Sequence, residues 1–247
     1  MSGTAATLTF DASGRPLHGR AFRLRRVLNW FPLGLTYAFL YMGRYNLTVA
    51  KNALGHLMSK EDFGVIAGVG SWVYALSFLL NGPLTDRLGG KKAILAAAGG
   101  SSVMNLLMGL YVQSVMGDAG ALAGSMRWPM ALLYGANMYF QSAAAVAVIK
   151  VNAHWFHVRE RGGFSGIFGT MISSGLFFAY TLNGWILDWA TRDTPVGQHG
   201  PVWWVFLAPS AILAFMFFFE LVVLRDSPGQ AGHHDFDTGD AGSDDTS

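Results

Sequence analysis

The sequence predicts an all-α membrane protein built from six transmembrane helices. Only 13% of the 247 residues are charged and 52% are hydrophobic, whereas a soluble domain carries about 25% charged residues. Six apolar segments each reach the roughly 20 residues that a transmembrane helix requires. Backbone polar groups in lipid must find partners within their own segment, so each of these segments is predicted to be a helix.

The six predicted spans cover residues 27–50, 62–83, 92–115, 126–149, 164–187 and 202–224. Residues 1–26, which precede them, are predicted to form a cytoplasmic arm that is rich in arginine. Residues 225–247, which follow them, are rich in Asp, Gly and Ser and have no apolar periodicity. This composition is typical of disordered segments, so we predict a disordered acidic cytoplasmic tail.

The distribution of Lys and Arg predicts the orientation of the spans. Twelve of the 17 cations lie in the two termini and in the loops on their side, four lie on the other side, and Arg44 lies inside the first span. Cytoplasmic loops of membrane proteins carry the excess of Lys and Arg. Both termini are therefore predicted to be cytoplasmic, in a multi-pass protein of the plasma (inner) membrane.

An internal repeat is visible where the second and fifth spans end. Residues 81–86 and 183–188 both read N-G-x-[LI]-x-D. Three spans separate the two copies, so they end on opposite sides of the membrane. This relation predicts a 3+3 bundle, in which two three-helix repeats have inverted topology.

Arg44 is the strongest candidate for a binding residue, because a cation in the middle of a span costs roughly 2.5–3.5 kcal/mol on insertion. Tyr37 and Tyr41 precede it on the same helical face. A guanidinium suits carboxylate or phosphate oxygens, so this face predicts an anion-binding cavity. Gln141 is predicted to line the same cavity. The alternative is that Arg44 snorkels to an interface or pairs with a neighbouring helix.

A charged, glycine-rich loop between the second and third spans carries a motif. It reads G-x-L-x-D-R-x-G-x-K-x-x-I from Gly82 to Ile94. This motif resembles the loop signature of the major facilitator superfamily, with Gly90 where that family usually has Arg. The resemblance implies that five residues of the loop hold one access state rather than bind substrate. They are Gly82, Asp86, Arg87, Gly89 and Lys91.

The first span resembles that of the organophosphate:phosphate antiporters, the family of the glycerol-3-phosphate and hexose-phosphate transporters. The shared pattern is Tyr37-x3-Tyr41-x2-Arg44-x-Asn46, and Tyr74 matches the helix-two tyrosine of that family. In the family the helix-one Arg binds the substrate phosphate, which implies the same role for Arg44. The predicted substrate-binding residues are Arg44, Tyr37, Tyr41, Tyr74 and Gln141.

The chain also departs from that family. Phe78 stands where the glycerol-3-phosphate members have a helix-two Lys, Ile172 stands where they have a helix-five His, and residues 145–147 read Ala-Val-Ala in place of Trp-Pro-Pro. Anion–cation-type relatives in the same superfamily also have Arg-x-Asn-Leu in the first helix, as this chain has from Arg44. An organic carboxylate is therefore a second predicted substrate class.

The resemblance implies a partner, because major facilitators bind substrate between two six-helix halves. The chain could be a subunit that pairs with a separately encoded half, one copy of a homodimer, or a truncated anchor or sensor that does not transport. The sequence has no Cys and no visible catalytic triad, so neither an enzyme, a cofactor nor a metal site is predicted. Its cations lie beside apolar spans, which excludes nucleic acid as an expected partner. The predicted function is alternating-access transport of a small anion across the lipid bilayer, by phosphate or organophosphate exchange or by carboxylate:H⁺ symport.

Overall fold

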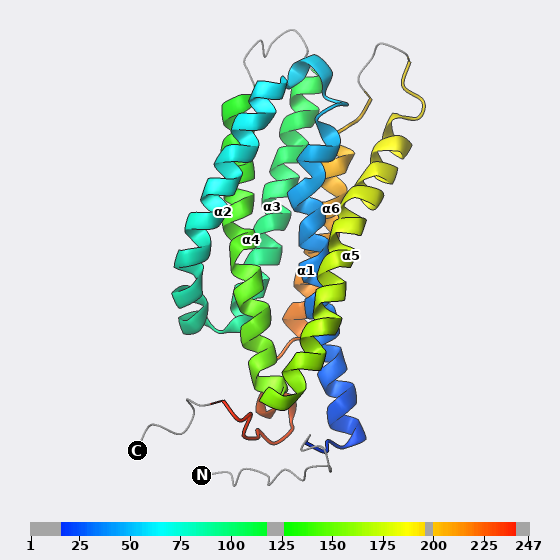
Figure 1. Ribbon diagram of the computed structural model, residues 1–247. Coiled ribbons are helices and arrows are strands. Elements are labelled where there is room, and N and C mark those ends of the chain that lie inside the picture. The colour runs from blue at the N-terminus through cyan, green and yellow to red at the C-terminus, as the bar shows by residue number, and fades with distance from the viewer. Residues whose placement is uncertain (1–15, 118–125, 196–199, 241–247) are drawn as a thin grey trace.

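The computed structural model describes residues 16–117, 126–195 and 200–240. Within them the chain forms six long α-helices that run side by side as a bundle (Figure 1). Their bounds are α1 Arg20–Ala50, α2 Lys60–Leu88, α3 Gly90–Gly117, α4 Arg127–Trp155, α5 Val158–Thr191 and α6 Trp204–Val223, with short 3₁₀ turns η1 Gly55–Leu57 and η2 Gly229–Ala231. The first and last described residues lie at the same end of the bundle, named here the terminal end (Figure 1).

The predicted all-α membrane fold is confirmed. In the described part of the chain, the five helices from α2 to α6 are long and apolar enough to cross a membrane. Helix α1 has sufficient length at 31 residues, but its arginines and the polar residues of its apolar stretch, such as Asn29, Thr36 and Tyr37, make it less apolar. It begins at Arg20, before the predicted start of the first span at 27. The first turns of α1, which contain four arginines, are therefore helical and continuous with the predicted span.

The packing of the helices repeats across the bundle. Helix α2 packs against α4, and α5 packs against α1 in the corresponding way. Helices α3 and α6 likewise pack against α4 and α1, and they also pack against each other. The same pairs of helices are in contact when α1, α2 and α3 are exchanged with α4, α5 and α6, respectively. The packing therefore supports the predicted inverted three-helix repeats.

The two asparagines of the repeated N-G-x-[LI]-x-D sequence make matching contacts. Asn81 Nδ2 on α2 donates to the carbonyl oxygen of Tyr139 on α4 at 3.3 Å. Asn183 Nδ2 on α5 donates to the carbonyl oxygen of Met42 on α1 at 3.0 Å. Both side chains are buried. The short sequence repeat thus marks a repeated structural contact between equivalent helix pairs.

Two hydrophobic clusters fill the bundle, one toward each end, and a polar layer separates them. On α1 the cluster at the terminal end reaches Tyr41, and the other cluster begins at Leu47. The buried polar side chains of the layer are Asn46, Ser101, Asn105, Asn137, Gln141, Ser142 and Asn183. Polar side chains inside a membrane bundle bond across helices. This layer therefore fixes the heights of the helices relative to one another.

The segment from 226 to 240 differs from the predicted disordered tail. It folds back across the terminal end of the bundle and ends near the start of α5. Asp240 accepts two hydrogen bonds from the Arg161 guanidinium, both at 2.6 Å. The ring of Phe236 packs against α1. A few aromatic and charged residues therefore hold this segment in place, although its overall composition is typical of disorder; residues 241–247 lie outside the described part.

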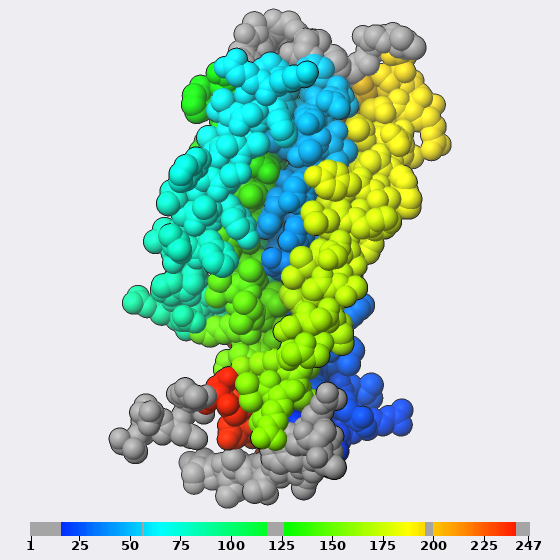
Figure 2. Space-filling view, in the orientation of Figure 1, coloured from blue at the N-terminus to red at the C-terminus, as the bar shows by residue number. Residues whose placement is uncertain are grey.

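One face of the bundle is hollowed along its length. Helices α2 and α5 stand forward on either side of the hollow, and α1 and α4 lie between them as its floor (Figure 2). In their most apolar stretches, α2 and α5 have a far smaller share of buried residues than α3 and α4 do. The hollowed face is therefore bordered by two helices with large exposed apolar surfaces.

Candidate functional site

Arg44 lies in the polar layer, in the second half of α1, and is half-buried. Its Nε donates a hydrogen bond to Oε1 of Gln141 on α4 at 3.0 Å. Its guanidinium carbon lies 4.9 Å from the ring centre of Tyr41 and 4.7 Å from that of Tyr74 on α2. These cation–π contacts and the hydrogen bond hold the guanidinium among α1, α2 and α4. The contacts place the side chain at mid-height, away from both ends of the bundle.

Tyrosine rings continue along the same face of α1. Tyr37 packs edge-on against Tyr41 with ring centres 5.7 Å apart, and Tyr41 stacks on Tyr45 at 6.0 Å. Tyr45 in turn approaches Tyr180 of α5 at 5.4 Å. The spacing of four residues places the α1 rings one above another. Of the predicted residues, Tyr41, Tyr74 and Gln141 contact Arg44 directly, whereas Tyr37 is packed against Tyr41 and is only 8% exposed.

A chain of buried amides holds Gln141 in turn. Its Nε2 donates to Oδ1 of Asn137, one turn earlier on α4, at 3.2 Å. Asn105 of α3 donates to the same oxygen at 3.2 Å, and Asn46 of α1 donates to Asn105 at 2.6 Å. All four amide side chains are fully buried. Hydrogen bonds in such a low-dielectric network are strong, so the network fixes Gln141 and thereby orients Arg44.

Three successive carbonyls of α1 also accept side-chain hydrogen bonds from neighbouring helices. The carbonyl oxygen of Met42 accepts a hydrogen bond from Nδ2 of Asn183 on α5 at 3.0 Å. The carbonyl of Gly43 binds Asn137 at 2.9 Å, and that of Arg44 binds the Tyr134 hydroxyl at 2.9 Å. These supporting residues are not among the predicted site residues. Their polarity inside apolar spans was the signal that could have identified them.

The charge of Arg44 has no carboxylate partner in the described part of the chain. The ion pairs there involve other cations. Of the guanidinium nitrogens, Nε is hydrogen-bonded and the two terminal nitrogens have no hydrogen-bond partner among the described residues. A planar pair of free donors, held between aromatic rings, can bind two oxygens of a carboxylate or phosphate.

The loop between α2 and α3 forms a second polar cluster, at the terminal end. Gly89 ends α2 with φ of +89°, a conformation that residues with a Cβ rarely adopt. Lys150 of α4 donates to the Asp86 carboxylate at 3.0 Å and to its carbonyl at 2.8 Å. The backbone N–H of Lys91 donates to Asp226 at 2.7 Å. The motif therefore ties α2 to α4, and α3 to the segment that follows α6.

The other loop residues divide into two groups. Gly82 has no atom within 4 Å of where a Cβ would lie, and Arg87 is exposed without a polar partner among the described residues. A Cβ at Gly90, by contrast, would lie 2.5 Å from Cγ2 of Val151 and 3.0 Å from the Ala147 carbonyl oxygen. Helices α3 and α4 are thus too close here for a larger residue. This close approach explains the glycine at a position where the family usually has Arg.

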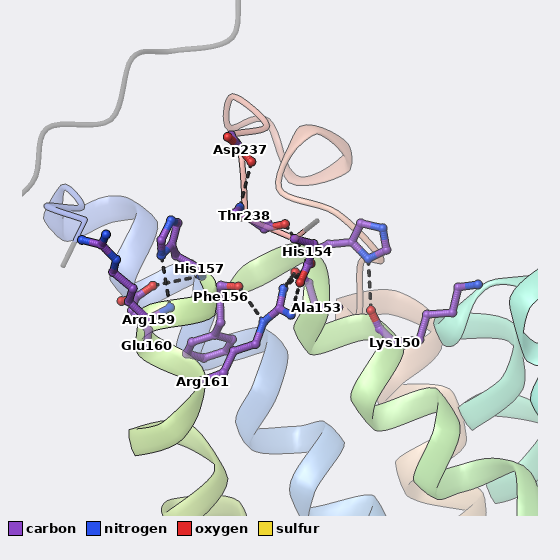
Figure 3. Close-up of polar contacts among 12 residues, drawn as sticks. Lys150, Ala153, His154, Phe156, His157, Arg159, Glu160, Arg161, Asp237 and Thr238 are labelled. Carbon is purple, nitrogen blue, oxygen red and sulfur yellow. Dashed lines mark hydrogen bonds and ion pairs between the residues drawn. The ribbon is translucent and has the colours of Figure 1, made fainter. Parts of the chain in front are cut away.

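The start of α5 organises further charges of the terminal end (Figure 3). Nδ1 of His157 accepts a hydrogen bond from the backbone N–H of Arg159 at 3.2 Å, which caps the helix. Glu160 accepts one from the backbone N–H of His157 at 3.3 Å and pairs with Arg26 of α1 at 3.0 Å. The Arg161 guanidinium donates to two carbonyls near the end of α4. These contacts join the starts of α1 and α5 to the end of α4.

The fold and the site together define a polytopic helical membrane protein with a charged, aromatic-lined position at mid-height. The chain belongs to the Major Facilitator Superfamily, because the model of that family matches residues 33–240. The match runs from α1 to the segment that follows α6. The family expected from the loop motif is therefore confirmed.

Three curated relatives match the chain at low identity. The membrane sensor protein UhpC of Salmonella typhimurium is 22% identical over 186 residues, which cover 65% of this chain and 39% of the relative. The UhpC of Escherichia coli K12 is 22% identical over 143 residues, 57% of this chain and 30% of the relative. A D-galactonate transporter of Escherichia coli O6:H1 is 25% identical over 186 residues, 72% of this chain and 40% of the relative. The matches therefore span 30 to 40% of the relatives' lengths.

Proposed function

We propose that this bundle is one half of a carrier that binds a small organic anion at Arg44 and moves it across the membrane by alternating access. The observation that carries the proposal is a guanidinium at mid-height that is oriented by Gln141 and two tyrosines but has no carboxylate partner among the described residues. A cation inside a span costs roughly 2.5–3.5 kcal/mol. An anion bound from the hollowed face would offset that cost.

The first candidate substrates are organophosphates or phosphate. Their oxygens match the two terminal donors of Arg44, and the Tyr41 and Tyr74 hydroxyls can add hydrogen bonds. Phe78, whose ring lies 6.3 Å from that of Tyr74, puts an apolar group where the resembling antiporters have a Lys. A site with one cation also suits a carboxylate. A sugar acid is therefore the second candidate, and the D-galactonate transporter among the relatives supports it.

We propose that a second six-helix unit covers the hollowed face. A single bundle leaves Arg44 open on that face, and alternating access needs two bundles that rock around the site. The exposed apolar surfaces of α2 and α5, which border the hollow, provide area for such a contact. A separately encoded subunit and a second copy of this chain both fit. Cross-linking through single cysteines introduced on α2 and α5 would distinguish them.

We also propose that the terminal end faces the cytoplasm of the plasma (inner) membrane. The excess of Lys and Arg on that side supports this orientation. Because the chain has no Cys, single cysteines report topology cleanly. Asp237→Cys at the terminal end should react with an impermeant thiol reagent only after cells are opened. Asp193→Cys at the opposite end should react in intact cells, and the reverse pattern would contradict the proposal.

Direct binding tests the proposed site without the partner half. The purified protein would be titrated calorimetrically with glycerol-3-phosphate, inorganic phosphate and D-galactonate. We expect Arg44→Gln to weaken binding of the preferred anion at least about tenfold, since a hydrogen bond to a charged group contributes about 1.5–3 kcal/mol. Arg192→Gln, which removes an exposed cation at the opposite end, should bind like the wild type. Equal affinity of Arg44→Gln and the wild type for every anion would remove Arg44 from the site.

A sensor of the same anion is the second candidate function, because two of the relatives are named membrane sensor proteins. It uses the same site but predicts binding without flux. Proteoliposomes that contain the chain together with its second half would be tested for uptake of the labelled anion. Uptake that depends on Arg44 supports the carrier, whereas binding without uptake supports the sensor. We propose no catalytic role, since members of this family move solutes or sense them rather than transform them.

A further inference from the structure

A second cation lies on the same face of α1 as Arg44, toward the end of the bundle opposite the terminal end. Lys51 directly follows α1, keeps helical backbone angles and comes seven residues after Arg44, which is two turns, or roughly 10 Å, farther along the helix axis. Its Nζ lies 4.7 Å from the ring centre of Phe63 on α2. Arg44 makes the same kind of contact with Tyr74, eleven residues after Phe63 and so on the same face of α2. The two cations therefore bridge α1 to α2 in the same way at two levels.

A cavity, named here the Lys51 cavity, opens beside this lysine. Its volume is about 500 Å³, within the range of roughly 300–1,000 Å³ that is typical of small-molecule sites. Lys51 lines it together with Lys60, the first residue of α2, and the polar residues Asn52 and Ser59. Among the described residues, no Asp or Glu contributes to its wall. The cavity is therefore lined by cations and neutral groups.

The two lysines of this cavity have no acidic partner in the part of the chain that the structure describes. The ion pairs found there involve other cations. Glu61 and Asp62 are the nearest acids in the sequence, and both pair with Arg127, at 3.0 Å and 2.7 Å. Only four cations were assigned to this side of the membrane from the sequence. Two of them thus meet at one cavity, where no described residue neutralises their charge.

The Lys51 cavity suits a free anion better than a lipid. Its large apolar side chains are Phe63, which lies beneath the Lys51 ammonium group, and Met58, which is only 4% exposed. An acyl chain would therefore find little uncovered apolar surface in the cavity. A small anion needs no such surface, since it binds through charge and hydrogen bonds.

We propose that the Lys51 cavity is a second binding site for a small oxyanion, a phosphate or a carboxylate, held between the ammonium groups of Lys51 and Lys60. Each ammonium group is a compact charge with three rotatable donors, which suits oxyanions of different shapes. An anion that enters the hollow from this end would meet this site before it meets Arg44. Cations placed in series raise the local concentration of an anion along its path. This role in supplying Arg44 rests on the proposed function, whereas binding in the Lys51 cavity does not.

A single reporter thiol measures the charge of the Lys51 cavity. The chain has no Cys and Asn52 is an exposed residue of the lining, so Asn52→Cys places one thiol there. The full chain in phosphatidylcholine nanodiscs would react with an anionic and a neutral methanethiosulfonate of similar size. We expect the ratio of the anionic to the neutral rate to fall about fivefold when Lys51→Gln and Lys60→Gln are added, because about this factor corresponds to one contact between unit charges in water. Arg192→Gln, which removes an exposed cation at the same end of the bundle, is the matched control and should leave the ratio unchanged.

Calorimetric titration with inorganic phosphate counts the sites. We expect two sites in the wild type, one in the Lys51→Gln, Lys60→Gln double variant and one in Arg44→Gln, so that failure of either site is seen separately. Lys60→Gln alone keeps the contact between Lys51 and Phe63, so it should weaken the second site while the helical circular dichroism stays unchanged.

Two results would overturn the proposal. The first is an unchanged rate ratio, or two remaining phosphate sites, in the folded double variant. The second is protection of Asn52→Cys from the neutral reagent by added phosphatidylglycerol but not by phosphate, because the cavity would then hold a lipid headgroup.

Discussion

Arg44 and Gln141 occupy equivalent positions in the two three-helix repeats, and they hydrogen-bond to each other at 3.0 Å. Arg44 lies two residues after Met42, whose carbonyl accepts a hydrogen bond from Asn183. Gln141 lies two residues after Tyr139, whose carbonyl accepts the matching hydrogen bond from Asn81. Two equivalent positions can meet only close to the axis that relates the repeats. One repeat therefore supplies a cation at this axis, and the other supplies its acceptor. The site at the axis therefore carries a single charge although the two positions are equivalent.

Gln141→Glu should abolish anion binding while the bundle remains folded. The new carboxylate would lie at hydrogen-bond distance from the Arg44 guanidinium and neutralise it, so a bound anion would no longer be favoured. Glu cannot donate to Asn137 as Gln141 does, which costs about 1 kcal/mol of stability. Calorimetric titration and thermal unfolding would measure both effects. Gln141→Leu, which removes the acceptor without adding charge, is the control and should retain partial binding; wild-type affinity in the Glu variant would contradict the role of the Arg44 charge.

Gly90→Arg should destabilise the bundle although it restores the residue that the family usually has. The new Cβ would lie 2.5 Å from Cγ2 of Val151 and 3.0 Å from a carbonyl oxygen of α4, and overpacking of this kind costs about 1–3 kcal/mol. Gly82→Ala, where a Cβ meets nothing within 4 Å, should leave the thermal midpoint unchanged or raise it. Adding Val151→Ala to the Gly90→Arg variant should recover part of the loss. A wild-type midpoint for Gly90→Arg would mean that α3 and α4 are farther apart in solution.

The segment from 226 to 240 should leave the terminal end in acid. Hydrogen bonds from the Arg161 guanidinium hold the pKa of Asp240 below its usual value of 3.8. Because the pKa of the docked state is lowered, the carboxylate stabilises docking above the usual value, and this stabilisation is lost as the pH falls through the lowered pKa. Asp240→Asn should release the segment already at pH 7. A spin label at Asp237→Cys would report the release as increased mobility, with Asp193→Asn as the control; an immobile label in the Asp240→Asn variant would show that other contacts suffice.

The variant Glu220→Gln on α6 should be thermally more stable than the variant Thr36→Val, which removes the hydroxyl that donates to Glu220. The carboxyl is fully buried and accepts a hydrogen bond from Thr36 Oγ1 at 2.8 Å, and among the described residues its other oxygen has no partner. Glu220→Gln keeps the acceptor and carries no charge, so thermal stability should be unchanged or higher. Thr36→Val leaves the buried carboxyl unpaired, which costs about 1–3 kcal/mol. If Glu220→Gln is the less stable of the two, the carboxyl has a function that its described contacts do not explain.

The sequence was sufficient to predict the helices and the face of α1 that Tyr41 and Arg44 share. Apolar segment length determines where a span can lie, and the spacing of Tyr41 and Arg44 places them on one face whatever the rest of the bundle does. The amide network was not predictable in the same way. Whether Asn105 meets Asn137 depends on how α3 and α4 are rotated and how closely they approach, which no local pattern records.

The segment after α6 shows a different limit of sequence reasoning. Its average composition is typical of disorder, but docking depends on a few individual partners such as Phe236 and Asp240. Gly90 is a similar case, because its role is set by Val151, which lies far from it in the sequence. Averages over a segment cannot reveal pairings of this kind.

The three carbonyls of α1 that bind α4 and α5 restrict how the bundle can move. A helix held from two sides at one level cannot turn about its own axis there without breaking several buried hydrogen bonds at once. Any tilt of α4 or α5 must therefore carry the Arg44 guanidinium with it. Flexing of α1 is left to regions away from that level, such as the turns beside Pro32, where proline removes one rung of the helix's hydrogen-bond ladder.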